Sequence, residues 1–204
     1  MKLFIYPVTD LQTNCYVLVD EKSNEAVAID IGGDESFILL EELKHGFKIK
    51  NVLLTHTHFD HVGGVYKFYE RGANVYVGLN DYEGVKNGDL NLSSMFGGTV
   101  KQFEAKTLNG GETLVFGEIK VEVINTPGHT KGGVTYKVND MLFCGDTVFL
   151  SSFGRVDFPG GDIKTLKNSI YKLFDYSGCV LYPGHGAKTS VLSEKNTNPI
   201  KYYD

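Results

Sequence analysis

The chain has 204 residues, 42% of them hydrophobic, and this composition is sufficient for one sizeable core. A formal net charge of −5 with scattered Lys residues argues against a nucleic-acid partner, and no stretch approaches the ~18 apolar residues of a membrane span. Cys15, Cys144 and Cys179 form no CxxC pair, which argues against a disulfide framework and a thiolate zinc site. The N-terminal apolar run is too short for a signal peptide, so we expect a cytoplasmic protein with a single domain over residues 1–204.

The first half of the chain predicts strands that alternate with helices. The expected strands cover residues 2–8, 15–20, 25–33, 49–58 and 74–78. A helix is expected over residues 34–46, where apolar side chains recur at near-helical spacing: Phe37, Leu39, Leu40 and Leu43. Asp34 or Ser36 is placed to cap this helix and Gly46 to end it. A second helix is expected over residues 62–72.

The second half repeats this pattern after a polar stretch. Residues 79–110 fit either a short helix with a long loop or a plain surface insertion. The expected strands cover residues 112–117, 119–128, 133–139, 141–146 and 179–186. Asn139-Asp140 predicts a hairpin turn, and residues 162–175 form a clear amphipathic helix that Asp162 is placed to start. The alternation predicts an α/β (α+β) protein with two packed sheets and outer helices, a four-layer αββα sandwich.

The stretch "LLTHTHFDHVGG", residues 53–64, contains three histidines and an aspartate in six positions. Three further polar residues end apolar strands elsewhere in the chain. Together these seven side chains are His56, His58, Asp60, His61, His129, Asp146 and His185. All lie just past predicted strand ends, where loops converge on one edge. The remaining histidine, His45, is expected to be a surface or hydrogen-bonded residue at a helix C-terminus.

Five imidazoles and two carboxylates form a nitrogen and oxygen donor set that suits Zn, Fe or Mn. Seven donors exceed what one tetrahedral zinc ion uses, so the set favours two divalent ions with one bridging carboxylate. A Gly-Asp pair such as Gly145-Asp146 is, taken alone, more often a turn than a ligand. The His-x-His-x-Asp-His spacing has no explanation in packing, and it therefore predicts a metal site with Zn as the first expectation.

Five motifs together resemble the metallo-β-lactamase superfamily: "AIDIGG", "THTHFDHVGG", "NTPGHTKGG", "FCGDT" and "YPGHG". The stretch "FGRVDFPGGD" and the pair Asn198-Pro199 resemble its glyoxalase II branch, in particular the short relatives of hydroxyacylglutathione hydrolase. The resemblance spans nearly the whole chain and implies the same αββα sandwich.

The resemblance also implies roles for individual residues. It assigns His56, His58 and His129 to a first metal, Asp60, His61 and His185 to a second, and Asp146 to a bridge between them. It further implies that Asp30 orients a ligand histidine, although an Asx turn explains an aspartate there almost as well. Arg155 matches a basic residue that meets a substrate carboxylate, with a surface ion pair as its alternative role.

The implied reaction is hydrolysis of a small acyl thioester by a hydroxide that bridges the two metals, with Asp60 and Asp146 as the catalytic carboxylates. No side-chain nucleophile is needed, and the chain contains no G-x-S-x-G elbow. No nucleic acid or membrane is expected as a partner.

Several other functions remain open at this point. A persulfide dioxygenase relative uses a single Fe, held by counterparts of His56, His129 and Asp146. A β-lactamase, a nuclease, a hydrolase of another ester or amide, and a non-catalytic metal-binding module are less favoured.

The resemblance argues against tuned recognition of glutathione. The longer glyoxalase II enzymes add a helical domain after the last ligand histidine, whereas 19 residues follow His185 here. Two tyrosines of those enzymes correspond to Asp157 and Ala187. We therefore expect slow, weakly saturable hydrolysis of lactoylglutathione.

Overall fold

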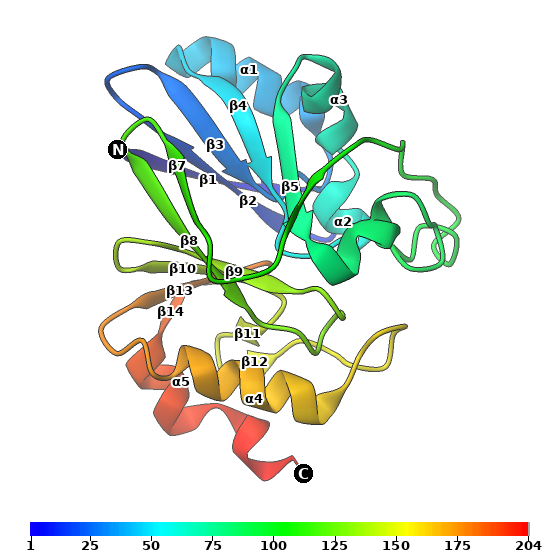
Figure 1. The fold of residues 1–204 in the computed structure, drawn as a ribbon, viewed down its shortest axis with the longest axis vertical. Coiled ribbons are helices and arrows are strands. Elements are labelled where there is room, and N and C mark those ends of the chain that lie inside the picture. Colours follow the sequence, from blue (N-terminus) through cyan, green and yellow to red (C-terminus); the bar gives the residue numbers. More distant parts are fainter. Residues whose placement is uncertain (204) are drawn as a thin grey trace.

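Two six-stranded sheets lie face to face in the computed structural model, which describes residues 1–203, and helices cover their outer faces (Figure 1). The predicted four-layer αββα sandwich is therefore confirmed. Within residues 1–203, no helix has the length and apolar character needed to cross a membrane.

The first sheet follows the chain in its strand order. Its strands are β1 (Lys2–Val8), β2 (Thr13–Val19), β3 (Glu25–Ile29), β4 (Lys48–Leu53), β5 (Asn74–Gly78) and β6 (Lys106–Leu108). The first three pair antiparallel, whereas β3 to β6 pair parallel. Parallel neighbours need crossover connections. These are α1 (Glu35–His45) between β3 and β4, and α2 (Phe59–Val62) with α3 (Val65–Glu70) between β4 and β5.

The second sheet has the order β14-β13-β10-β9-β8-β7. Its strands are β7 (Thr113–Phe116), β8 (Ile119–Asn125), β9 (Val134–Val138), β10 (Met141–Gly145), β13 (Val180–Pro183) and β14 (Thr189–Ser190). The parallel pair β10 and β13 is connected through a small hairpin, β11 (Val148–Phe149) and β12 (Ser152–Phe153), and then α4 (Ile163–Leu173). In both sheets the carboxyl ends of the parallel strands meet at one edge, the usual place for a binding site in such sheets.

Three apolar cores fill the three interfaces between the four layers. Tyr136 and Phe143 are fully buried between the two sheets. Ile38 and Phe68 pack their helices onto the first sheet, and Leu166 packs α4 onto the second. As predicted, Asp162 caps α4, where its carboxylate accepts the backbone N–H of Thr165.

The prediction of which side of α1 is buried is wrong. Leu40 and Leu43 are 62% and 81% exposed, whereas Ile38, Glu41 and Glu42 are buried against the sheet. The buried Glu42 carboxylate accepts the backbone N–H of Ile49, a donor that has no partner in the sheet. The helix does end at Gly46, which adopts a left-handed conformation. Asp34 stands at the cap position, but its carboxylate accepts the N–H of Thr9 instead.

The predicted second helix is divided into α2 and α3 at Gly63-Gly64. Here the chain passes so close to Gly32 that a Cβ on Gly63 would lie 2.5 Å from the Gly32 carbonyl oxygen. This close approach breaks the helix, and the shorter α2 carries Asp60 and His61 toward the sheet edge.

Of the two alternatives for residues 79–110, the structure contains the short helix with a long loop: a 3₁₀ helix, η1 (Leu79–Val85), precedes the loop. The strand β6 that ends this stretch was not predicted. The C-terminal tail also folds, into β14, α5 (Val191–Thr197) and a 3₁₀ turn, η2 (Pro199–Tyr202).

A buried glutamate fastens the C-terminal tail to the second sheet. Glu194 is fully buried. Its carboxylate accepts the N–H of Ser151, the hydroxyl of Thr189 and the amide of Asn198. These donors come from the β12 side of the sandwich, from β14 and from the chain end, so one side chain joins three segments.

We predict that Glu194→Ala lowers the free energy of unfolding by about 3 kcal/mol or more, because each donor left unpaired in a buried site costs roughly 1–3 kcal/mol. Urea denaturation followed by circular dichroism measures this change. Glu70→Ala is the matched control, since Glu70 is exposed and makes surface contacts with Lys67, at 4.0 Å, and with Tyr66, and its loss should change stability by less than about 0.5 kcal/mol. Equal effects of the two variants would contradict the role given to Glu194.

Candidate metal centre

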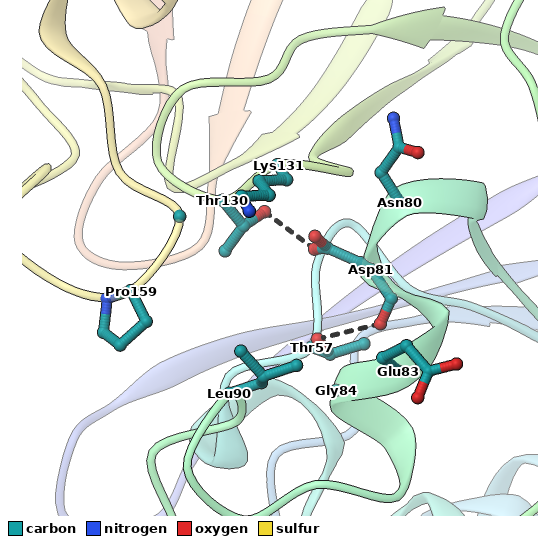
Figure 2. A pocket seen from close by; sticks show the side chains of 10 residues that line it. Thr57, Asn80, Asp81, Glu83, Gly84, Leu90, Thr130, Lys131 and Pro159 are labelled. Carbon is teal, nitrogen blue, oxygen red and sulfur yellow. Dashed lines mark hydrogen bonds between the residues drawn. The ribbon is translucent and has the colours of Figure 1, made fainter.

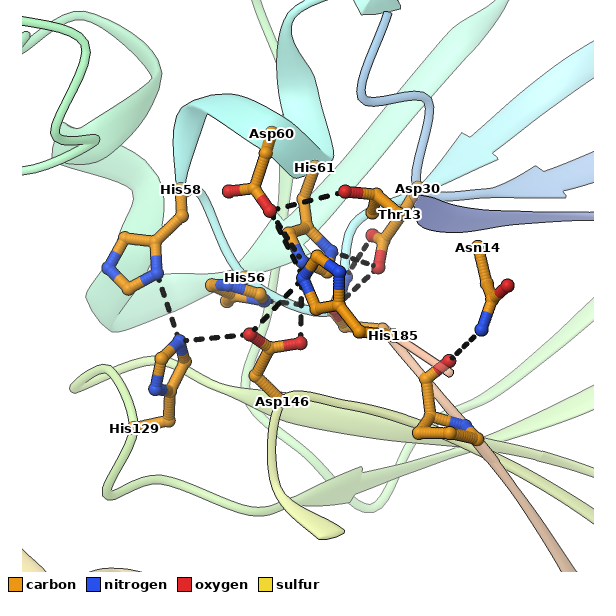
Figure 3. A network of polar contacts seen from close by, with 12 residues as sticks. Thr13, Asn14, Asp30, His56, His58, Asp60, His61, His129, Asp146 and His185 are labelled. Atoms are coloured by element: carbon orange, nitrogen blue, oxygen red, sulfur yellow. Dashed lines mark hydrogen bonds and ion pairs between the residues drawn. The ribbon is translucent and has the colours of Figure 1, made fainter. Parts of the chain in front are cut away.

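All seven side chains predicted to bind metal converge at the edge of the sandwich where the parallel strands end (Figure 3). His56 and His58 lie on the loop after β4, and Asp60 and His61 lie on α2. The other three follow strands of the second sheet: His129 after β8, Asp146 after β10 and His185 after β13. The site therefore draws on both sheets and requires that they be packed together.

The first group of donors contains three imidazoles. Donor atoms of His56, His58 and His129 lie within 4.8 Å of one another. His129 Nε2 is 2.9 Å from His58 Nδ1 and 3.5 Å from a carboxylate oxygen of Asp146. All three histidines are buried, with exposed fractions of 5% or less.

The second group mixes imidazole and carboxylate donors. Atoms of Asp60, His61 and His185 lie within 4.8 Å of one another. His185 Nε2 is 3.1 Å from Asp60 Oδ2, and His61 Nε2 is 3.4 Å from Asp146 Oδ1. Asp146 Oδ2 lies 3.5 Å from His129 Nε2 and 3.7 Å from His185 Nε2, so the Asp146 carboxylate faces both groups, as expected of a bridging carboxylate.

Three atoms that face the centre are buried without a hydrogen-bond partner among residues 1–203: His56 Nε2, His61 Nε2 and Asp146 Oδ1. His58 presents Nδ1 to His129, and its Nε2 lies on the opposite side of the ring (Figure 3). A buried polar atom that stays unpaired costs roughly 1–3 kcal/mol, so three together need an explanation. Cations held between them would satisfy all three at once. The donor types and their convergence therefore fit metal ions.

Hydrogen bonds behind the imidazoles fix which nitrogen faces the centre. His61 Nδ1 lies 2.8 Å from Asp30 Oδ2, and the Asp30 carboxylate also accepts the N–H and the hydroxyl of Thr55. His129 Nδ1 lies 2.7 Å from the carbonyl oxygen of Arg155. His185 Nδ1 lies 3.0 Å from a carbonyl oxygen on the turn after β1. With Nδ1 held as a donor, Nε2 is left to bind a metal.

The electrostatic environment differs between the two groups. Burial and the neighbouring imidazoles lower the pKa of His56 well below its usual range, and they lower the pKa of His58 to about 3. Burial alone would also lower the pKa of His61. The carboxylates of Asp60 and Asp146 outweigh burial and raise it well above its usual range. His56 and His58 therefore present neutral imidazoles, whereas His61 of the second group lies in a negative field.

Asp81 was not predicted to belong to the site. It is buried on η1, and burial raises its pKa. One carboxylate oxygen accepts the Thr130 hydroxyl at 2.7 Å and the other accepts the Gly132 N–H at 2.6 Å. The Asp81 carbonyl accepts the Thr57 hydroxyl at 3.3 Å. Asp81 thus ties the loop of His58 to the loop of His129, but a single aspartate in a polar stretch carries no sequence signal of this role.

Two polar residues at the start of β2 were also missed. The Thr13 hydroxyl donates to Asp60 Oδ2 at 3.2 Å. The Asn14 amide donates to the carbonyls of Pro183 and Gly186, on either side of His185. Both residues attach the edge of the first sheet to the second group of donors.

Arg155, predicted to bind substrate, forms an ion pair in the structure. Its guanidinium donates to both carboxylate oxygens of Asp157, at 2.6 and 2.5 Å, and stacks on the ring of Phe158 at 3.9 Å. The alternative role as a surface ion pair is therefore the one that the structure contains.

Comparison with known proteins agrees with this geometry. Residues 8–185 match the family model for the metallo-beta-lactamase superfamily, and the chain belongs to this superfamily. A probable metallo-hydrolase of Bacillus subtilis (strain 168), YqgX, is 34% identical over 98% of this chain and 97% of its own length. The hydroxyacylglutathione hydrolase GloC of Haemophilus influenzae is 31% identical over 98% of each chain. The cluster described above is therefore the His/Asp metal-binding cluster of a metallo-hydrolase family.

Solved structures show the same fold. BLEG-1, a B3 metallo-beta-lactamase, superimposes with a TM-score of 0.91 at 32% identity over 97% of this chain and 98% of its own. TTHA1623 in a di-iron-bound form gives 0.87 at 31% identity over 96% and 98%. ETHE1 from Myxococcus xanthus gives 0.82 at 26% identity over 98% of this chain and 84% of its own.

We predict that Asp30→Asn weakens zinc binding at the second donor group by about ten- to hundredfold, because the partner that orients His61 and adds negative charge is altered. Titration against a chromophoric chelator measures the two affinities separately. Asp175→Asn, at an exposed position beyond α4, is the control. An unchanged affinity in Asp30→Asn would show that His61 needs no such partner.

Proposed function

We propose that this protein is a dinuclear metallohydrolase that cleaves small acyl thioesters. The observation that carries the proposal is Asp146, whose carboxylate lies within 4 Å of histidines from both groups of donors: His129 of the first, and His61 and His185 of the second. The first metal would be held by His56, His58 and His129, and the second by Asp60, His61 and His185. Zn is the first expectation, with Fe or Mn as alternatives, and the di-iron form of TTHA1623 supports two ions in this fold.

When bound, the two divalent ions supply Lewis acidity, which lowers the pKa of water and polarises an acyl carbonyl. The residues of the chain hold that chemistry in place. Asp60 is kept in position by the Thr13 hydroxyl and by His185. Asp146 spans the two donor groups, so its charge offsets positive charge on both sides. A thiolate leaving group, with a conjugate-acid pKa of about 8.5, departs with little protonation, and the site accordingly needs no dedicated acid.

The comparisons support the thioester class and leave a second candidate. The chain covers 98% of GloC, so the activity in that protein's name resides in a chain of similar extent. A helical domain after the last histidine is therefore not needed for that activity, and its absence no longer argues against lactoylglutathione as a substrate. The ion pair of Arg155 with Asp157 still argues against it, because it occupies a cation that could bind a carboxylate of glutathione. The second candidate is a mononuclear-iron persulfide dioxygenase, supported by the similarity to ETHE1.

We predict that the fully loaded protein binds about two metal ions per chain and that Asp146→Ala loses most of the bound metal and the activity. The reason is that both donor groups lose the carboxylate they share. Elemental analysis by mass spectrometry gives the stoichiometry, with Asp175→Ala as the control. An Asp146→Ala variant that retains two ions and normal turnover would rule out the bridge.

We predict hydrolysis of acyl thioesters without consumption of oxygen. Thiol release, followed with a chromogenic disulfide, and an oxygen electrode distinguish the two candidates on one protein preparation. Lactoylglutathione should be hydrolysed with a weakly saturable rate. Rapid oxygen uptake with a thiol persulfide, together with a single iron per chain, would favour the dioxygenase and exclude the hydrolase.

A further inference from the structure

A cavity of about 270 Å³ lies between the loops after β4 and β8, the 3₁₀ helix η1 and the segment around Pro159 (Figure 2). Its walls include Thr57 and Thr130, the residues that follow His56 and His129 in the chain. Leu90 and Pro159 add an apolar surface on the side that faces them. The cavity therefore lies next to the loops that carry His56, His58 and His129, and its walls are partly polar and partly apolar.

Lys131 is the only cationic residue among those that line this cavity. Its backbone is fixed on both sides, because the Asp81 carboxylate binds the hydroxyl of Thr130 and the N–H of Gly132. Its stem lies against Gly160, where a Cβ would come 3.3 Å from Lys131 Cγ. Lys131 is exposed, and these contacts fix its backbone and the start of its side chain beside the cavity.

The charge of Lys131 is not used within the protein. Among residues 1–203 no carboxylate forms an ion pair with it. Asp81 is close, but both of its carboxylate oxygens already accept hydrogen bonds. Glu83 also lines the cavity, and its carboxylate points away from Lys131 (Figure 2). The other cation near the site, Arg155, is neutralised by Asp157.

We propose that this cavity binds the acyl arm of the substrate and that Lys131 selects acyl groups with a terminal carboxylate. This inference rests on the proposed thioesterase function. The volume of about 270 Å³ is close to that of small-ligand cavities, so the space accepts a short acyl chain. A carboxylate on such a chain meets an unpaired ammonium, a charge-assisted contact that a neutral group cannot make.

The test uses two N-acetylcysteamine thioesters of equal size and the metal-loaded protein. One carries a glutaryl group, and the other carries its neutral monoamide. We expect kcat/KM for the glutaryl thioester to be higher by about tenfold. Lys131→Met should remove this preference, and Lys131→Glu should reverse it. Lys120→Met, which changes an exposed lysine on β8, should keep it.

Two further measurements decide the remaining cases. Calorimetric titration with free glutarate should show binding that Lys131→Met loses and Lys120→Met keeps, and this result does not depend on turnover. A protein that cleaves neither thioester yet binds glutarate through Lys131 would retain the subsite and refute the thioesterase. Cleavage of both thioesters with equal kcat/KM would refute the subsite alone. If Lys131 instead discriminates charge on the thiol arm, tested with butyryl thioesters of mercaptopropionate and its amide, the acyl assignment is wrong.

Discussion

The rest of the structure depends on one constraint: buried polar atoms that converge at one edge of the sandwich, without partners in the protein, have to be held in place. Leaving such atoms buried costs several kcal/mol in total, and imidazoles crowded together repel one another when protonated. The fold meets this constraint by fixing the opposite side of each ring. Acceptors for Nδ1 of His61, His129 and His185 come from Asp30, the Arg155 carbonyl and the Leu11 carbonyl. Since these acceptors belong to distant segments, the site is complete only when both sheets are packed.

Two glycines in the sequence motifs help to hold these atoms in place, because their lack of a side chain leaves room for the metal-binding residues. A Cβ on Gly184 would lie 2.2 Å from Asp146 Oδ1 and 2.7 Å from His61 Cε1, so any side chain there would displace two of the central residues. A Cβ on Gly32 would lie 1.7 Å from the Asp60 carbonyl oxygen. The first glycine of "YPGHG", Gly184, and the first glycine of "AIDIGG", Gly32, are thus explained by their contact with the site. At both positions the backbone passes so close to other atoms that no side chain fits.

The donor cluster could be predicted from the sequence because its spacing has no explanation in packing, and the strand ends gave the remaining partners. Other features depend on contacts that a linear pattern does not contain. Glu42 is buried on α1 because Ile49, in the next strand, offers a free N–H. The break between α2 and α3 depends on the path of Gly32, far away in the chain. Asp81 acts through two loops that meet only in the folded protein.

The two donor groups differ in charge, and this difference bears on which ion each one favours. The lowered pKa of His56 and His58 indicates two neutral imidazoles, whereas the raised pKa of His61 reflects the negative field of the carboxylates around it. Imidazole donors suit Zn and Fe, and carboxylates favour harder ions such as Mn. A field that favours a proton on His61 also favours a divalent cation there, so metal binding at the second group competes with protonation. If each group binds one ion, as proposed above, the two ions can differ, and their relative occupancy should follow the supply of metal as well as affinity.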